Sequence, residues 1–168
     1  MIRDLGTKSP RIHPTAFVSE AAYVVGDVEI GENSSIWPGA VLRGDYGKIS
    51  VGKNTNVQDN CVLHSDDHLY VGDNVVVTHG AVLHCRRVGN NVMIGINAVL
   101  LENVEIGDNC MIAAGSVVLS GTVIENGSVV IGVPGSARPL KSQYIKRIRD
   151  SVNQYRNNAK RFKKANLG

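Results

Sequence analysis

The sequence predicts an all-β solenoid, a left-handed parallel β-helix of hexapeptide repeats followed by a C-terminal α-helix. Three observations indicate this fold: a six-residue repeat, glycine at a regular place within it, and a basic C-terminal segment with helical periodicity. A six-residue period is neither that of a helix nor that of a simple alternating strand. It is typical of a coil in which each side is one short strand and one corner. The repeated positions are Ile30, Ile36, Leu42; Val51, Val57, Leu63; Val71, Val77, Leu83; Val88, Ile94, Leu100; and Ile106, Ile112, Val118.

Three such sides close one triangular turn. The first repeated residue of each group is followed by glycine, and a small residue often comes four positions after a repeated one. Turns of about eighteen residues, with small insertions at corners, would then stack about 4.8 Å apart with paired backbones. We expect this coil from about His13 to Pro134, as five full turns and partial ones, within a first domain of residues 1–137.

Residues 138–168 form the second predicted unit, an amphipathic helix that packs on the coil. The apolar residues Ile145, Ile148, Val152, Tyr155, Ala159 and Phe162 are three or four positions apart, which makes one narrow stripe. Ten of the 18 Lys and Arg residues lie here, against one of the 15 Asp and Glu residues. No interleaving of aromatic and basic residues supports nucleic-acid binding, so we expect a solvated basic face with neither a nucleic-acid nor a membrane partner.

The chain has 168 residues, enough for one sizeable core, and its three cysteines are an odd number. The first residues lack the apolar centre of a signal peptide, and no apolar run approaches the length of a membrane span. A protein of the reducing cytoplasm is the simplest expectation.

Stacking the turns places the histidines. Arg43, His64 and His84 each follow the third repeated residue of a turn, so they should point outward in one ladder. His79 belongs to a different side or corner, where Asp59 occupies the same place one turn earlier. If three coils pack around a threefold axis, His79 of one chain can face the ladder of the next. Three neutral imidazoles with an open fourth position suit Zn²⁺, although Fe²⁺ or Co²⁺ would fit.

The stretches WPGAVLRGDYGKI, VGKNTNVQDNCVLH and THGAVLHC closely resemble the signature of the γ-class carbonic anhydrases. The resemblance implies a homotrimer of left-handed β-helices with metal sites between subunits, which hydrates CO₂ reversibly to bicarbonate. By the same resemblance His64, His79 and His84 are the metal ligands. Arg43 and Asp45 would form a salt bridge between subunits, Asn56 would support the loop, Gln58 and Asp59 would hydrogen-bond the metal-bound hydroxide or its surroundings, and Tyr155 would lie near the active site.

The sequence departs from the active members of that family at two places tied to proton transfer. Tyr46 stands where they carry a glutamate, and the short SDDHLY replaces an acidic loop. Asp66 or Asp67 could accept protons there, but so short a loop is more typical of a solvated corner. We therefore expect low turnover as one outcome. Two alternatives stay open: an acyl-CoA thioesterase on the same scaffold, and a non-catalytic structural homologue. An acyltransferase would normally use a catalytic histidine without metal.

Overall fold

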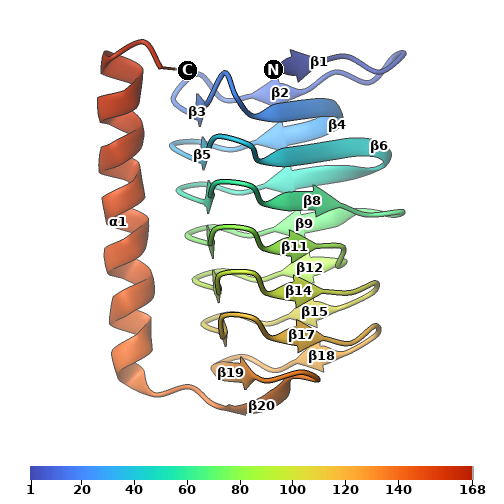
Figure 1. Cartoon of the computed structure of the whole chain (residues 1–168), viewed down its shortest axis with the longest axis vertical. Helices are drawn as coiled ribbons and strands as arrows, with labels where there is room; N and C mark the ends of the chain where they lie inside the picture. Colours follow the sequence, from blue (N-terminus) through green and yellow to red (C-terminus); the bar gives the residue numbers. More distant parts are fainter. Residues whose placement is uncertain (168) are drawn as a thin grey trace.

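The computed structural model describes residues 1–167 and shows the left-handed parallel β-helix that the repeat predicts. Successive turns lie one above another, and the helix α1 (Ser142–Lys164) runs alongside the stack (Figure 1). Every neighbouring pair of coil strands is parallel except the last, in which β19 and β20 are antiparallel. The coil also begins earlier than the expected His13, because Ile2 pairs with Val24 through the backbone without a full repeat.

The coil has three faces, and two long strands bend from one face to another. The first face stacks β2 (Arg11–Ile12), β4 (Tyr23–Ile30), β6 (Val41–Val51), β9 (Leu69–Val71), β12 (Arg87–Val88), β15 (Glu105–Ile106) and β18 (Val123–Ile124). The second stacks β3 (Phe17–Val18), β5 (Ser35–Ile36), β7 (Asn56–Val57), β10 (Val76–Val77), β13 (Met93–Ile94), β16 (Met111–Ile112), β19 (Ser128–Ile131) and β20 (Ser136–Pro139). The third stacks β1 (Ile2–Arg3), the first parts of β4 and β6, β8 (Val62–His64), β11 (Val82–Leu83), β14 (Val99–Leu100) and β17 (Val117–Val118).

The core is a single column of small and branched side chains inside the triangle. The repeated residues from Ile30 to Val118 are all nearly inaccessible, and so are the small residues between them, such as Ala40 and Ala81. Because two inward positions of each hexapeptide alternate a branched and a small side chain, the column fills without large aromatic residues. Asn or Gly with a positive φ occupies the corners, since these residues tolerate the left-handed backbone of a sharp turn.

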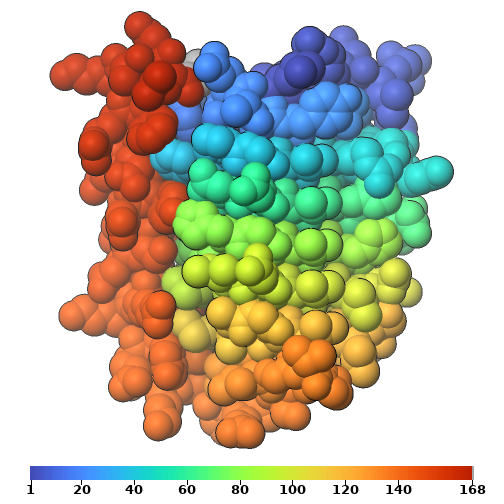
Figure 2. All heavy atoms as spheres, viewed as in Figure 1, coloured from blue at the N-terminus to red at the C-terminus, as the bar shows by residue number. Residues whose placement is uncertain are grey.

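Helix α1 packs on the second face and runs back toward the N-terminal end of the coil, as Figures 1 and 2 show. Ile148 and Val152 lie against Val76, Met93 and Met111 of the coil. Near the other end of the helix, the aromatic residues Phe17, Trp37, Tyr155 and Phe162 pack with Ala159. The predicted apolar stripe is therefore present with one change. Ile145 is exposed, and Tyr144, one position earlier, packs in its place.

None of the helical segments within residues 1–167 combines the length and the apolar composition needed to cross a membrane.

Candidate metal centre

Two of the three predicted ligands lie together on one outer ladder. His64 ends β8 and His84 directly follows β11, and these strands pair with Leu63 opposite Leu83. The two imidazole rings are therefore one turn apart, with 5.2 Å between their centroids. Arg43 of β6 pairs with His64 from the turn before, which places it next in the same ladder. This neighbourhood is the one that the repeat predicts.

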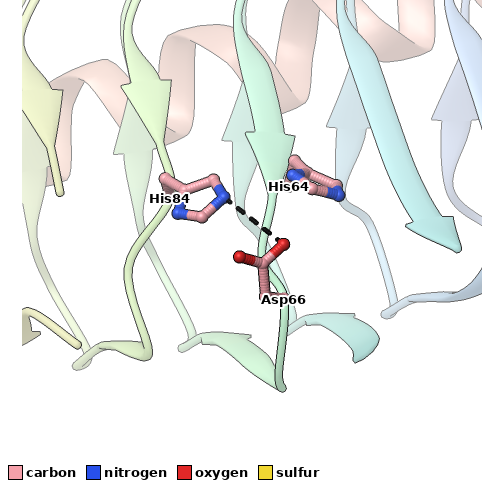
Figure 3. Close-up of side chains that lie close together, drawn as sticks. All are labelled: His64, Asp66 and His84. Atoms are coloured by element: carbon pink, nitrogen blue, oxygen red, sulfur yellow. Dashed lines mark ion pairs between the residues drawn. The ribbon is translucent and has the colours of Figure 1, made fainter. Parts of the chain in front are cut away.

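Asp66 lies in the short SDDHLY segment that follows β8, and its side chain approaches the same two histidines (Figure 3). Its Oδ1 lies 4.0 Å from Nε2 of His84, and one ligand atom from each of His64, Asp66 and His84 lies within 4.8 Å of the others. The Asp66 side chain is 76% exposed, so it can reorient at little cost. The sequence predicts no contact between this residue and the two histidines. The signal for its approach was its place two residues after His64.

Asp45 connects His64 to Arg43 within the chain. Its Oδ1 lies 3.0 Å from Nε2 of His64, and its Oδ2 accepts a hydrogen bond from Nη1 of Arg43. Desolvation is the largest single influence on Asp45 and opposes its ionisation. The hydrogen bonds from Arg43, its own backbone, His64 and Tyr46 together outweigh it, so the pKa of this carboxyl lies below its usual range. The predicted salt bridge between subunits stays a prediction, since here both partners belong to one chain.

His79 lies at a different corner, between β10 and β11. Its Nδ1 is 2.9 Å from Oδ2 of Asp59, the residue that stacks one turn earlier. A carboxylate at this position favours a hydrogen on Nδ1 and leaves Nε2 with its lone pair, the state that a metal ligand requires. The His79 side chain is 46% exposed and is not part of the cluster formed by His64, Asp66 and His84.

Gln58, Asn56 and Tyr155 lie on the His79 side of the coil. Gln58 and Asn56 are buried, and Nε2 of Gln58 donates a hydrogen bond of 2.9 Å to Oδ1 of Asn56. Burial raises the pKa of Tyr155, and the negative charge of Asp59 adds to this effect. Gln58, His79 and Tyr155 line one groove between the second face and α1. The structure thus gathers the predicted residues into two half-sites at different corners.

The donor set fits a transition metal. His64 and His84 each offer an imidazole nitrogen at one corner, and His79 offers a third at another. In each of the three rings, one nitrogen lies close to a carboxylate oxygen. Imidazole is a preferred ligand of Zn²⁺, and open tetrahedral sites with three histidines are known for this ion. Within one chain, two of the three histidines lie at one corner and the third lies at another, so a site with all three would require the corners of two chains.

Comparisons with known proteins identify the family to which this chain is similar. The family model "Bacterial transferase hexapeptide (six repeats)" matches residues 9–44 and 87–120. The probable carbonic anhydrase of Methanocaldococcus jannaschii is 48% identical over 141 residues, covering 82% of this chain and 89% of that protein. Gamma carbonic anhydrase 2, mitochondrial, of Arabidopsis thaliana is 47% identical over 105 residues, covering 58% of this chain but only 38% of that protein. A Bacillus cereus protein with the provisional description acetyltransferase has a TM-score of 0.94 at 34% identity over 98% of both chains.

The fold and the repeat matches define a hexapeptide-repeat β-helix protein. Within this class, the chain belongs to the γ-class carbonic anhydrase family.

Proposed function

We propose that this protein is a metal-dependent carbonic anhydrase, which hydrates CO₂ reversibly to bicarbonate at sites between the subunits of a homotrimer. One observation carries the proposal. His64 and His84 stack at one corner and His79 stands at another, in a chain that is 48% identical to the M. jannaschii relative. His64 and His84 would hold the metal from one subunit and His79 from its neighbour. The cofactor would be Zn²⁺, and Fe²⁺ or Co²⁺ would fit the same nitrogens.

When bound to three neutral ligands, Zn²⁺ lowers the pKa of water to about 7, which supplies a nucleophile at cellular pH. Residues of the chain itself would orient the metal ligands and line the site. Asp59 holds the ring of His79 through Nδ1. Gln58 uses one N–H for Asn56, which leaves its second N–H and its carbonyl oxygen for a ligand in the groove. A preorganised amide of this kind is typical of sites that stabilise developing negative charge.

A proton must leave the site in each cycle, and Asp66 is the acceptor that the geometry favours. Its carboxylate is 4.0 Å from Nε2 of His84 and is largely exposed, so it can pass a proton to bulk water. Tyr46, at the place of the family's glutamate, is 69% exposed and has no carboxylate. Proton release would therefore depend on the short corner that carries Asp66, and we expect a low turnover.

The three cysteines are free and buried in the described part of the chain, which supports our proposal of a reducing, cytoplasmic compartment.

Thioester hydrolysis is the second candidate, because the B. cereus neighbour is described as an acetyltransferase. The groove beside His79 combines apolar side chains, such as Met93 and Met111, with Arg147 of α1. The apolar part of such a surface could contact an acyl chain, and the arginine could contact a phosphate.

One experiment separates the candidates. The protein is purified anaerobically, its metal is measured, and the same sample is assayed for CO₂ hydration by stopped flow between pH 6 and 9 and for acetyl-CoA hydrolysis. We expect about one metal ion per chain and measurable hydration that is abolished by a chelator and restored by Zn²⁺. Acetyl-CoA hydrolysis without CO₂ hydration would favour the thioesterase. Bound metal without either activity would favour the non-catalytic homologue.

A further inference from the structure

The second ring nitrogen of His84 lacks a partner in the structure. Nδ1 of His84 is buried and makes no hydrogen bond, whereas Nε2 faces Asp66 on the ligand side of the ring. A buried N–H or lone pair is normally satisfied by a partner, so a neighbouring acceptor or donor is expected. The ring thus has one nitrogen toward the cluster with His64 and one toward the next turn of the coil.

Glu102 is the group that faces this unpartnered nitrogen. It follows Leu101, the residue stacked beyond His84, and its Oε1 lies 3.7 Å from Nδ1. Its other oxygen, Oε2, accepts a hydrogen bond of 2.7 Å from Oγ of Ser120, one turn further along the coil. The Glu102 side chain is 55% exposed, so a small rotation can close the remaining distance without moving the core.

We propose that Glu102 is a positioning residue for the metal site: it accepts the Nδ1–H of His84, so that Nε2 keeps its lone pair and faces the metal, and Ser120 holds the carboxylate in place. This proposal rests on the proposed function, since it assigns a role toward the same metal. Metal-ligating histidines usually donate their second N–H to a carboxylate or carbonyl, and losing that partner weakens metal binding by about 10- to 100-fold.

The three residues occupy three successive turns. Leu83, Leu100 and Val118 pair in register, and His84, Glu102 and Ser120 follow these pairs at the same corner. The stacking of the turns therefore sets the spacing between the hydroxyl of Ser120, the carboxylate of Glu102 and the imidazole of His84. The simpler alternative is that Glu102 is a solvated carboxylate with no influence on His84.

The first test uses the metal-free protein at pH 8, where imidazole is largely neutral. Heteronuclear NMR of the histidine rings reports which nitrogen carries the hydrogen. We expect the Nδ1–H tautomer for His84 in the wild type, retention of it in Glu102→Gln, which keeps an acceptor oxygen, and a shift toward Nε2–H in Glu102→Ala. A wild-type ring in the Nε2–H form would overturn the proposal.

The second test measures Zn²⁺ affinity of the full chain by chelator competition. We expect Glu102→Ala to bind about 10- to 100-fold more weakly, with Glu102→Gln closer to the wild type. Glu105→Ala is the matched control, because it removes a comparable surface carboxylate that pairs instead with Arg86, 3.5 Å away. Equal affinities for Glu102→Ala and Glu105→Ala would overturn the proposal and leave the proposed function intact. A wild-type protein that binds no metal would overturn the proposed function, and the tautomer would still decide whether Glu102 holds the ring.

Discussion

At the residue scale, single residues with special backbone geometry place the candidate ligands. His79 directly precedes Gly80, whose φ of +70° turns the chain sharply at the corner. This geometry puts the imidazole at the tip of the triangle, where it stays 46% exposed. Asn97 has the same left-handed backbone at the equivalent corner of the next turn, with a φ of 54°. Asparagine and glycine are the residues that adopt this conformation at least cost, so the repeat itself encodes the corners.

Gln58 is the residue whose proposed role is tested most directly by substitution. It is buried, it is hydrogen-bonded to Asn56, and it lines the groove with His79. We expect Gln58→Ala to retain the metal and to lower kcat for CO₂ hydration by about 10²-fold, because a preorganised donor is lost. The measurement is stopped-flow hydration together with metal analysis. Gln154→Ala, on the exposed helix side of the same groove, is the control and should leave kcat unchanged. An unchanged rate for Gln58→Ala would exclude the role.

The buried cysteines predict a pH dependence of thiol modification. Burial raises the pKa of Cys61 to about 11 and that of Cys85 to about 12, with the charge of Asp59 adding to the shift at Cys61. Since the thiolate is the reactive form and a raised pKa keeps the thiol protonated below it, native protein at pH 8 should resist iodoacetamide. In guanidinium chloride all three cysteines should react, which mass spectrometry can count. Rapid alkylation of the native protein at pH 8 would contradict this burial.

At the element scale, the packing of α1 on the second face builds one wall of the groove. Trp37 contacts Phe162 with 5.0 Å between ring centroids and Tyr155 with 5.3 Å. These edge-to-face contacts tie the C-terminal part of the helix to the early turns of the coil. The stripe of apolar residues in the sequence predicted the packing, but several faces of a coil could receive such a stripe. The helix packs on the second face because the buried aromatic residues Phe17 and Trp37 of the coil lie there and contact it.

Substitution of Phe162 tests this packing. We expect Phe162→Ala to reduce the free energy of unfolding by about 2 kcal/mol, below the 3–5 kcal/mol typical of a fully buried Phe, because this ring is only partly buried. Trp37 is the single tryptophan of the chain, so its fluorescence reports any loss of the packing around it. Its emission should shift to longer wavelength as water reaches the indole. Ile145→Ala changes an exposed residue of the same helix and should alter neither quantity. Unchanged emission for Phe162→Ala would show that the helix is held elsewhere.

At the scale of the whole molecule, the triangular coil keeps the two half-sites apart. His84 and His79 are five residues apart in sequence, yet they belong to different corners, and only His84 joins the cluster with His64. Because the coil is a rigid column with a packed core, neither corner can bend toward the other. Association of subunits is the remaining way to bring three histidines to one ion. Cyclic trimers repeat such a contact at every interface.

Mixing of variants tests this shared site. His79→Ala and His64→Ala alone should each lack metal and activity, with the coil intact, because neither side chain belongs to the apolar core of the coil. If the protein forms the proposed trimer, about a quarter of the interfaces refolded from an equal mixture should combine an intact His79 with an intact ladder, given random assembly. We therefore expect about a quarter of the wild-type metal content, measured by elemental analysis. A mixture of His64→Ala with His84→Ala is the control and should recover none, since both changes affect the same ladder. Equal recovery in both mixtures would contradict a site shared between corners.

The sequence by itself determined the coil, the inward residues and the ladder that joins Arg43, His64 and His84, because a strict repeat makes every turn superpose on the one before. It also placed Asp59 beside His79 by the same stacking. Only the tertiary structure decided the contacts that depend on side-chain direction and on segments outside the repeat. These include the approach of Asp66 from its insertion, the link from Asp45 to His64, and the early start of the coil at Ile2. The position of Glu102 between His84 and Ser120 belongs to this second group, since the repeat fixes the spacing but not the rotamer that turns a carboxylate toward a ring.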